Sequence, residues 1–221
     1  MTLDQKLTKK GYEVTRRLKE KYSSECALEY QGEAWKLLVL ARLSAQCTDK
    51  RVNVVAKPLF EAFPTVEDMA ECDIEELEKI IKPCGLYRMK AKEIKASCKM
   101  LLEKFSKNVP DNMDDLLLLP GVGRKIANLI LGDIYGKPAI VADTHCIRIS
   151  GRLGFTEEGE KNPIKVEKTL KKYITEEEQS DFCHRIVQFG REVCSARSPK
   201  CEECFLSDVC DAYKNQKNNR K

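Results

Sequence analysis

The sequence predicts an all-α protein. Apolar residues recur at three- and four-residue spacing through most of the 221 residues, a pattern typical of helices that bury one face. Residues that favour helix N-caps precede many of these segments. The one short apolar stretch that resembles a strand, 139–142, has no second candidate strand in the sequence with which to pair. With 42% hydrophobic residues, the chain can bury one large core or two small ones.

Composition indicates an intracellular protein. The net charge of +4 permits a polyanionic partner without requiring one, so any basic face must be local. The first ten residues lack the apolar core of a signal peptide, and no apolar run approaches membrane-spanning length. Most of the 11 cysteines lie singly inside helical patterns, which favours reduced thiols. We therefore expect a cytoplasmic protein without a membrane association.

The first half of the chain is expected to be a series of helices. A charged surface helix is predicted over 4–22, a mostly buried helix over 33–46 and a further helix over 50–60. Gln46 thus lies at a junction. Two capping boxes, Thr65 with Asp68 and Asp73 with Glu76, predict short helices. After a break at 83–85, a long helix is predicted over 87–105, which leaves Leu86 on the preceding turn.

The stretch Leu119-Pro-Gly-Val-Gly-Arg-Lys125 predicts a hairpin between two helices. Pro120 should end the first helix, and Gly121 and Gly123 permit a tight turn and close approach of another backbone. A helix that begins near Gly123 directs unpaired N–H groups outward, which suits a phosphate. An ordinary helix-helix turn is the alternative. Lys125, in the first turn of the second helix, is a candidate nucleophile beside that anion site.

The second half is also expected to be helical. Segment 139–142 is predicted to be a connector, and Asp143 is predicted to cap the next helix. Asn162 and Pro163 begin a helix through 173, and Thr175 with Glu178 predicts a capping box for a helix that ends near Val193. The tail, 213–221, is polar and basic and is expected to fray.

Four clustered cysteines, Cys194, Cys201, Cys204 and Cys210, have the spacing C-x6-C-x2-C-x5-C in a loop-rich window without an apolar stripe. Only one close pair is present, whereas zinc sites usually have two. Four thiolates spread over one loop favour a cubane iron-sulfur cluster. A zinc site is the second interpretation, and four unrelated free cysteines the third. The other seven cysteines are expected to fill cores.

Several polar residues allow both a functional and a structural interpretation. Asp143 can stabilise a developing cation on a sugar or relay a proton, or it can simply cap a helix, and Lys125 can be a surface lysine. Arg197 and Lys200 lie between the first two clustered cysteines, where they contact either a phosphate backbone or solvent. His145 and His184, the only histidines, are expected to make structural hydrogen bonds.

Taken together, the motifs resemble those of the endonuclease III family, iron-sulfur DNA glycosylases of the helix-hairpin-helix superfamily. Five separated motifs agree in order, namely Leu43-Ser-Ala-Gln-Cys-Thr-Asp49, Gly85-Leu-Tyr87, Leu119-Pro-Gly-Val-Gly-Arg-Lys125, Asp143-Thr-His145 and the C-x6-C-x2-C-x5-C window. The resemblance implies a six-helix barrel over 26–136, with the helix-hairpin-helix at about 113–135. It also implies a discontinuous domain, 1–25 with 137–221, that holds a [4Fe-4S] cluster in the loop 194–210. The cleft between the domains is expected to hold DNA.

The resemblance further implies a bifunctional DNA glycosylase and abasic-site lyase that acts as a monomer on double-stranded DNA containing damaged bases or abasic sites. By analogy Lys125 attacks C1′ of a flipped, oxidised pyrimidine nucleotide and forms a Schiff base that permits β-elimination, while Asp143 assists. Gln46 and Leu86 match residues that fill the gap left in the duplex. Gly121, Gly123, Arg124, Arg197 and Lys200 are expected to contact DNA, and Cys194, Cys201, Cys204 and Cys210 to bind the cluster.

Three alternatives remain at this point. The first is a monofunctional adenine or mismatch thymine glycosylase, in which water replaces the lysine as nucleophile. The presence of Lys125 argues against it, as does the lack of an extra C-terminal domain after Asp211. The second is a catalytically silent DNA-binding module, which binds without nicking the strand. The third is a zinc-stapled protein-interaction domain, which lacks the brown colour of an iron-sulfur protein.

Overall fold

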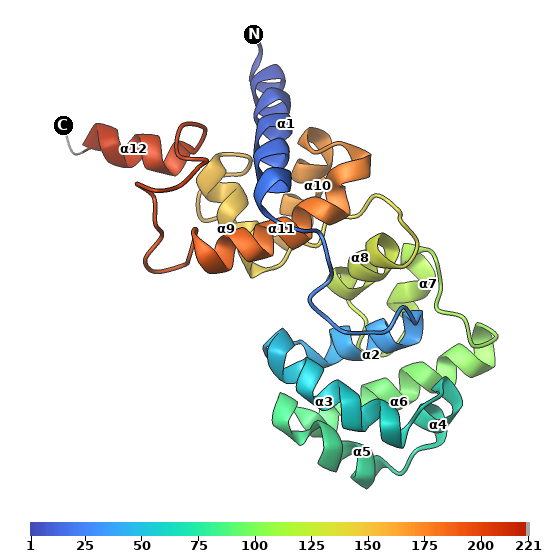
Figure 1. The fold of residues 1–221 in the computed structure, drawn as a ribbon. Coiled ribbons are helices and arrows are strands. Elements are labelled where there is room, and N and C mark those ends of the chain that lie inside the picture. Colours follow the sequence, from blue (N-terminus) through green and yellow to red (C-terminus); the bar gives the residue numbers. More distant parts are fainter. Residues whose placement is uncertain (220–221) are drawn as a thin grey trace. The chain divides into compact units, whose positions relative to one another are not determined.

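The computed structural model describes residues 1–219 and contains only helices and loops within that range (Figure 1). The last two residues of the predicted tail lie outside the described residues. Two compact units are present. One, the central unit, is Cys26–Tyr135, and the other, the composite unit, joins Met1–Glu25 to Gly136–Lys221. The break expected after Gly136 thus falls one residue earlier. No helix in the described part of the chain is long and apolar enough to cross a membrane.

The central unit consists of short helices around one long helix, α6. In chain order the elements are α2 (Ala34–Leu43), α3 (Asp49–Ala62), α4 (Val66–Glu71), α5 (Ile74–Ile81), the 3-10 turn η1 (Lys82–Cys84), α6 (Tyr87–Lys104), α7 (Met113–Leu118) and α8 (Arg124–Asp133). Helices α2, α4 and α5 pack on α6, and α2 also packs on α8. Buried residues on one stripe of α6, among them Ile94, Cys98 and Leu101, form the middle of this core.

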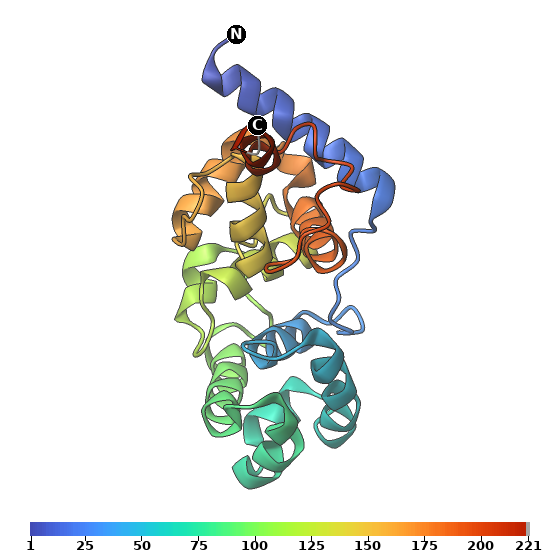
Figure 2. The same cartoon turned by 90° about the vertical axis from the view of Figure 1, so that its left-hand side faces the viewer.

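The composite unit is built around helix α9, which contacts three neighbouring helices. Its elements are α1 (Leu3–Lys21), α9 (Thr144–Leu153), α10 (Pro163–Tyr173), the 3-10 turn η2 (Glu176–Glu178), α11 (Gln179–Glu192) and α12 (Asp211–Asn219). Helix α9 packs on α10, α11 and α12. Figures 1 and 2 show α1 alongside α10 and α11, and this contact buries Val14 and Leu18 completely. The N-terminal segment is thereby part of the same core as the C-terminal half.

Most helix starts agree with the sequence predictions because their caps are local. Thr65 and Asp68 form both hydrogen bonds of a capping box, and Asp143 and Asn162 accept backbone N–H groups at the starts of α9 and α10. Segment 139–142 is a connector, as predicted.

Three local predictions were wrong. Asp73 accepts the N–H of Glu75, so it caps α5 without forming the predicted box. Thr175 makes no side-chain cap, because the chain first forms the 3-10 turn η2 and α11 begins only at Gln179. The tail predicted to fray forms α12, which packs on α9. The helix in the tail depends on contacts with a distant segment, and the polar sequence of the tail does not predict such contacts.

Candidate functional site

The predicted hairpin lies between α7 and α8 and is shaped by its backbone. Helix α7 ends at Leu118, and the Val122 N–H donates to the Leu119 carbonyl at 3.0 Å across the turn. Gly123 is the N-cap of α8 and offers no side-chain acceptor to the first amides of that helix. Those amides lie at the positive end of the helix dipole, where an anion is stabilised.

The two glycines of the hairpin have different roles. Gly121 has a φ of +75°, and a Cβ there would lie 2.8 Å from Arg42 Nε and 2.8 Å from Glu93 Oε2. Both the left-handed backbone and the packing of the central unit therefore require glycine at 121. Gly123 has a φ of −97°, and nothing lies within 4 Å of a Cβ added there. The hairpin surface at Gly123 is therefore open to another molecule.

Lys125 is the second residue of α8 and is exposed. No carboxylate within residues 1–219 pairs with its ammonium group. Arg124, half-buried, is the first residue of the same helix. A primary amine in the same first turn as these helix amides is chemically suited to react with a sugar whose phosphate the amides bind.

Gln46 and Leu86 share an unusual backbone. Gln46 has a φ of 55° and Leu86 a φ of 49°, so both lie in the left-handed region that side-chain-bearing residues seldom adopt. Both side chains are exposed, and 51% of Leu86 is accessible to solvent although it is apolar. Such a conformation costs on the order of 1 kcal/mol and persists only where the surrounding structure enforces it.

Lys90 contacts the segments just before both residues, and the sequence analysis did not single it out. The side chain is 0% exposed, and its ammonium donates to the carbonyls of Leu43 at 2.8 Å, Ala45 at 2.8 Å and Cys84 at 2.9 Å. The three donors of the ammonium are thus all used. Burial lowers the pKa of Lys90. The sequence did contain a sign of its burial, because Lys90 lies four residues before Ile94 and so falls within the apolar stripe of α6.

Two other polar residues of α6 support the hairpin itself. The Ser97 hydroxyl donates to the Pro120 carbonyl at 2.9 Å, and Arg42 Nε donates to Glu93 Oε2 at 2.5 Å beside Gly121. Ser97 is almost completely buried, and the Arg42–Glu93 pair is largely shielded from solvent. One face of α6 therefore holds the hairpin in the same way that Lys90 holds the segments before Gln46 and Leu86.

Asp143 is the N-cap of α9 in the composite unit. Its Oδ1 atom accepts the Cys146 N–H at 2.7 Å, as the capping prediction required, and the side chain is half-buried. Its second carboxylate oxygen remains available to a further donor or cation. Of the two histidines, His145 lies against Arg148 Nη2, with its Nδ1 at 3.2 Å. This contact fits the structural role expected of His145.

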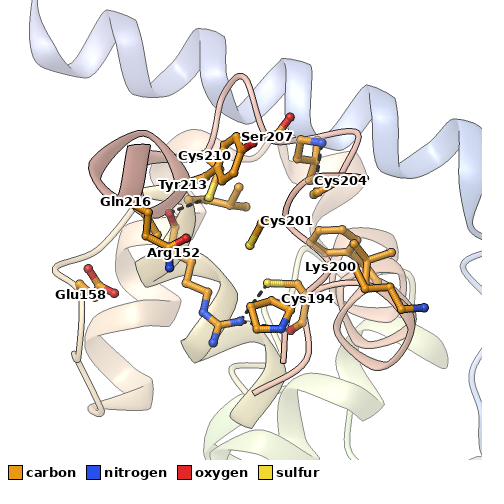
Figure 3. A pocket seen from close by; sticks show the side chains of 16 residues that line it. Arg152, Glu158, Cys194, Lys200, Cys201, Cys204, Ser207, Cys210, Tyr213 and Gln216 are labelled. Atoms are coloured by element: carbon orange, nitrogen blue, oxygen red, sulfur yellow. Dashed lines mark hydrogen bonds between the residues drawn. The ribbon is translucent and has the colours of Figure 1, made fainter. Parts of the chain in front are cut away.

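The four clustered cysteines line one cavity of about 150 Å³ (Figure 3). Typical pockets for organic ligands measure about 300 to 1,000 Å³, so this cavity suits a compact inorganic group. Burial raises the pKa of Cys204 to about 11, and it also raises the pKa of Cys201 and Cys210. Burial thus favours the protonated form of these three thiols, and binding of a metal centre releases their protons.

The spacing of the sulfur atoms distinguishes between the two metal centres considered for this loop. Four sulfurs around one zinc ion, each about 2.3 Å from it, lie about 3.8 Å from one another. Within the described residues, no three of these four sulfurs lie within 4.8 Å of one another. A cluster with several iron atoms separates its thiolate ligands more widely than a single ion does. The donor set therefore fits an iron-sulfur cluster better than zinc.

Arginines from two helices hold the cysteine loop in place. Arg152 of α9 donates to Cys194 Sγ at 3.3 Å and to the Ser195 carbonyl at 2.7 Å. Arg17 of α1 donates to the Phe205 carbonyl at 2.7 Å and to Asp208 Oδ1 at 2.6 Å. An N–H donor at a ligating sulfur is also one way in which proteins adjust an iron-sulfur centre.

The remaining predicted DNA contacts lie on the outside of the same loop. Arg197 and Lys200 are both exposed, and Figure 3 shows Lys200 extending away from the cavity. The Lys200 N–H donates to the Val193 carbonyl at 2.9 Å, which closes the loop at its base. Both cations are thus presented on a backbone that the cavity residues restrain.

Comparison with known proteins agrees with this arrangement. Residues 39–176 match the family model described as HhH-GPD superfamily base excision DNA repair protein, and residues 194–210 match the iron-sulfur binding domain of endonuclease III. Endonuclease III of Bacillus subtilis (strain 168) is 44% identical over 187 residues, which cover 85% of this chain and 84% of the relative. The chain belongs to the endonuclease III family.

Two further relatives support the same assignment. Endonuclease III of Synechocystis sp. is 43% identical over 195 residues, which cover 87% of this chain and 88% of that protein. Among solved structures, a trapped endonuclease III–DNA covalent intermediate in an estranged-adenine complex is 41% identical, with a TM-score of 0.87. That match covers 98% of this chain and 100% of the solved chain.

Membership in the endonuclease III family confirms several sequence predictions. The chain has the two-domain helix-hairpin-helix glycosylase fold, with a helical iron-sulfur domain, and the predicted six-helix barrel corresponds to the central unit that contains α2 to α8. It is a base excision repair enzyme, a DNA glycosylase and abasic-site lyase, and its partner is duplex DNA. Its cofactor is a [4Fe-4S] cluster. The zinc-stapled interaction domain, the silent DNA-binding module and the monofunctional glycosylase are thereby set aside.

Proposed function

We propose that this enzyme excises oxidised pyrimidines from duplex DNA and that Lys125 is its nucleophile. The observation that supports this role is the position of Lys125, an exposed amine in the first turn of α8, next to the uncapped amides behind Gly123. A lysine amine that attacks C1′ of the deoxyribose displaces the base. The sugar ring then opens at its C1′–O4′ bond, with a proton passing from nitrogen to O4′, and the iminium, or Schiff base, that forms links the Lys125 nitrogen to C1′.

The Schiff base explains how one amine performs both reactions. The positive nitrogen acidifies the C2′ hydrogen, and loss of that proton expels the 3′ phosphate from C3′ by β-elimination. Hydrolysis of the imine then frees Lys125. We assign to Asp143 the stabilisation of positive charge on the sugar, because its carboxylate has one oxygen engaged at the cap and one free.

Recognition of DNA is divided between backbone and side-chain contacts in this proposal. The amides at Gly121, Gly123 and Arg124 bind a phosphate, and Arg197 and Lys200 contact the backbone of the duplex. The exposed side chains of Gln46 and Leu86 enter the base stack and fill the space left by the extruded nucleotide. A rigid, strained loop is suited to that insertion because it loses little entropy on binding.

We assign Cys194, Cys201, Cys204 and Cys210 as the cluster ligands, because their side chains line the same cavity. When bound, the cluster supplies four metal–thiolate bonds that join the loop to itself. Arg152 and Arg17 orient the loop from outside. We further propose that the central unit, predicted as a barrel over 26–136, carries the nucleophile and that the composite unit, predicted as 1–25 with 137–221, forms the cluster domain.

We place the enzyme in the cytoplasm of a prokaryotic cell, associated with the nucleoid through DNA. The reducing cytoplasm keeps its many unpaired cysteines as thiols.

Borohydride trapping tests the nucleophile assignment. Borohydride reduces a Schiff base to a stable amine, so the wild-type enzyme with an abasic duplex should give a covalent protein–DNA adduct. The variant Lys125→Gln should give no adduct and should lose at least ~1,000-fold in strand cleavage. An adduct of wild-type yield from Lys125→Gln contradicts the assignment.

A second lysine serves as the matched control. Lys92 is exposed on α6, and Lys92→Gln should form the adduct as the wild type does. Duplexes that carry single lesions test the substrate class. Excision of oxidised pyrimidines with strand nicking supports the proposal, whereas base release without nicking and without an adduct points to water as the nucleophile.

A further inference from the structure

Lys90 connects two segments that carry the side chains proposed to enter the DNA stack. The Leu43 and Ala45 carbonyls immediately precede Gln46, and the Cys84 carbonyl lies two residues before Leu86. The two segments are about 40 residues apart in sequence, so no local turn links them. One ammonium group binds both, and all of these residues belong to the central unit.

The placement of Lys90 is electrostatically specific. Leu43 ends α2 and Cys84 ends η1, so their carbonyls belong to helix ends whose acceptors have no partner within the helix. A cation at such ends is favourable, whereas Lys90 sits in the first turns of its own helix α6, where a cation is unfavourable. Burying a charge is costly, so a simple space-filling residue at this position would serve the core better. The favourable interactions that offset the cost of burying this charge are therefore those with the two segments.

The backbone of both segments is also strained, at the residues proposed to enter the DNA stack. Gln46 and Leu86 have positive φ, and their side chains remain exposed instead of packing inward. Leu86 is the N-cap of α6 and makes no capping hydrogen bond through its side chain. The three carbonyl contacts of Lys90 restrain both turns from inside the core, where the side chains of Cys47 and Cys84 also contact each other.

We propose that Lys90 is a positioning residue for base extrusion: its ammonium group joins the two segments so that Gln46 and Leu86 act as a single wedge. The inference rests on the wedge role proposed above for Gln46 and Leu86. Lys90 does not touch the DNA in this scheme. It fixes the spacing between two side chains that must enter the duplex together.

A ratio of two rates tests the proposal in the intact holoenzyme. Extruding a stacked damaged base requires the wedge more than binding an already abasic sugar does. We therefore compare, under single-turnover conditions, excision of one thymine glycol with cleavage at one abasic site in the same duplex. Lys90→Met should lower the ratio of the two rates by about tenfold. A variant that only reduces the folded fraction lowers both rates equally and leaves the ratio unchanged.

Controls separate this role from a structural one. Lys95 lies on the same helix and donates to the Cys72 carbonyl at 2.5 Å, away from both segments. Lys95→Met should keep the ratio within about twofold of wild type. If Lys90→Met folds too poorly to purify, Lys90→Gln keeps two N–H donors for three carbonyls and should still lower the ratio by at least about threefold. Equal losses of both rates in either Lys90 variant overturn the proposal.

The double variant Gln46→Ala/Leu86→Ala separates the failure of this inference from failure of the wedge assignment. If the double variant keeps the wild-type ratio, the wedge roles of Gln46 and Leu86 are wrong. If it lowers the ratio and Lys90→Met does not, only the role of Lys90 is wrong. When Lys90→Met is added to the double variant, the ratio should fall by no more than about twofold, because Lys90 acts through those two side chains.

Discussion

The hairpin and the cysteine loop are both short, irregular segments, yet they obtain their shapes in different ways. The hairpin, residues 119–123, is fixed by backbone geometry and by a neighbouring helix, with Gly121 at φ +75° against Arg42 and Glu93. The cysteine loop, residues 194–210, has no helix and only one completely buried apolar side chain, Leu206. It is held by arginines outside it and by its ligand set inside.

The difference indicates which part of each segment its function depends on. The hairpin is complete as a folded backbone, so its amides are preorganised for an anion without any cofactor. If the four cysteines are the cluster ligands, as we propose, the loop depends on the group that they bind. Changes in the loop should act through the cofactor, whereas changes in the hairpin should act either on stability or on DNA binding, according to which glycine is altered.

Removal of a cluster ligand should have the largest effect. Cys201→Ser should abolish visible absorbance at about 400 nm and unfold the loop, because a hydroxyl is a poor iron ligand and the loop has little core of its own. Absorbance and circular dichroism measure the two losses. Cys72→Ser, at a buried cysteine of the central unit, is the control and should keep the absorbance. Full absorbance in Cys201→Ser would contradict the ligand assignment.

Gly121→Ala should have the next largest effect, on the stability of the central unit. The new Cβ must adopt a left-handed backbone and meets Arg42 Nε and Glu93 Oε2 at 2.8 Å. We expect the free energy of unfolding to fall by about 1–3 kcal/mol. Urea denaturation measures the change, and the cluster absorbance should stay at the wild-type level in the native protein. A loss below about 0.5 kcal/mol would show that the hairpin adapts.

Gly123→Ala should change DNA binding more than stability. Its φ is negative and the added methyl meets no atom of this chain within 4 Å, so the free energy of unfolding should change by less than about 1 kcal/mol. The same methyl would occupy the surface that a phosphate approaches, and the dissociation constant for an abasic duplex should rise by roughly tenfold. Fluorescence anisotropy measures it. Wild-type affinity in this variant would mean that DNA does not approach the hairpin at Gly123.

Arg17→Met should have the smallest effect, on cluster retention. The variant loses the hydrogen bonds to the Phe205 carbonyl and Asp208 that tie the loop to α1, which are partly exposed and contribute on the order of 1 kcal/mol. The rate of absorbance loss with an iron chelator should rise a few-fold. Arg16→Met is the matched control, because Arg16 pairs with Glu13 and Glu20 on its own helix. Equal rates of absorbance loss in the two variants would contradict a role of Arg17 in cluster retention.

The sequence by itself determined the features whose causes are local. Helical periodicity, the Pro120-Gly121 turn and the cap at Asp143 each depend on residues within a few positions of one another, so their predictions agree with the structure. The cysteine spacing is local in the same sense, because it places four thiols in one loop before any tertiary contact forms.

Only the tertiary structure decided the contacts between distant segments. Lys90 forms hydrogen bonds with the segments before Gln46 and Leu86, which lie tens of positions apart in the sequence. Arg42 and Glu93, which pack against Gly121, are likewise distant from it in the sequence. The same holds for the C-terminal helix α12, which is too polar to predict but packs on α9. The physical reason is that a buried ammonium, or a weak helix, is stable only where folding brings the particular acceptors or apolar surface to it.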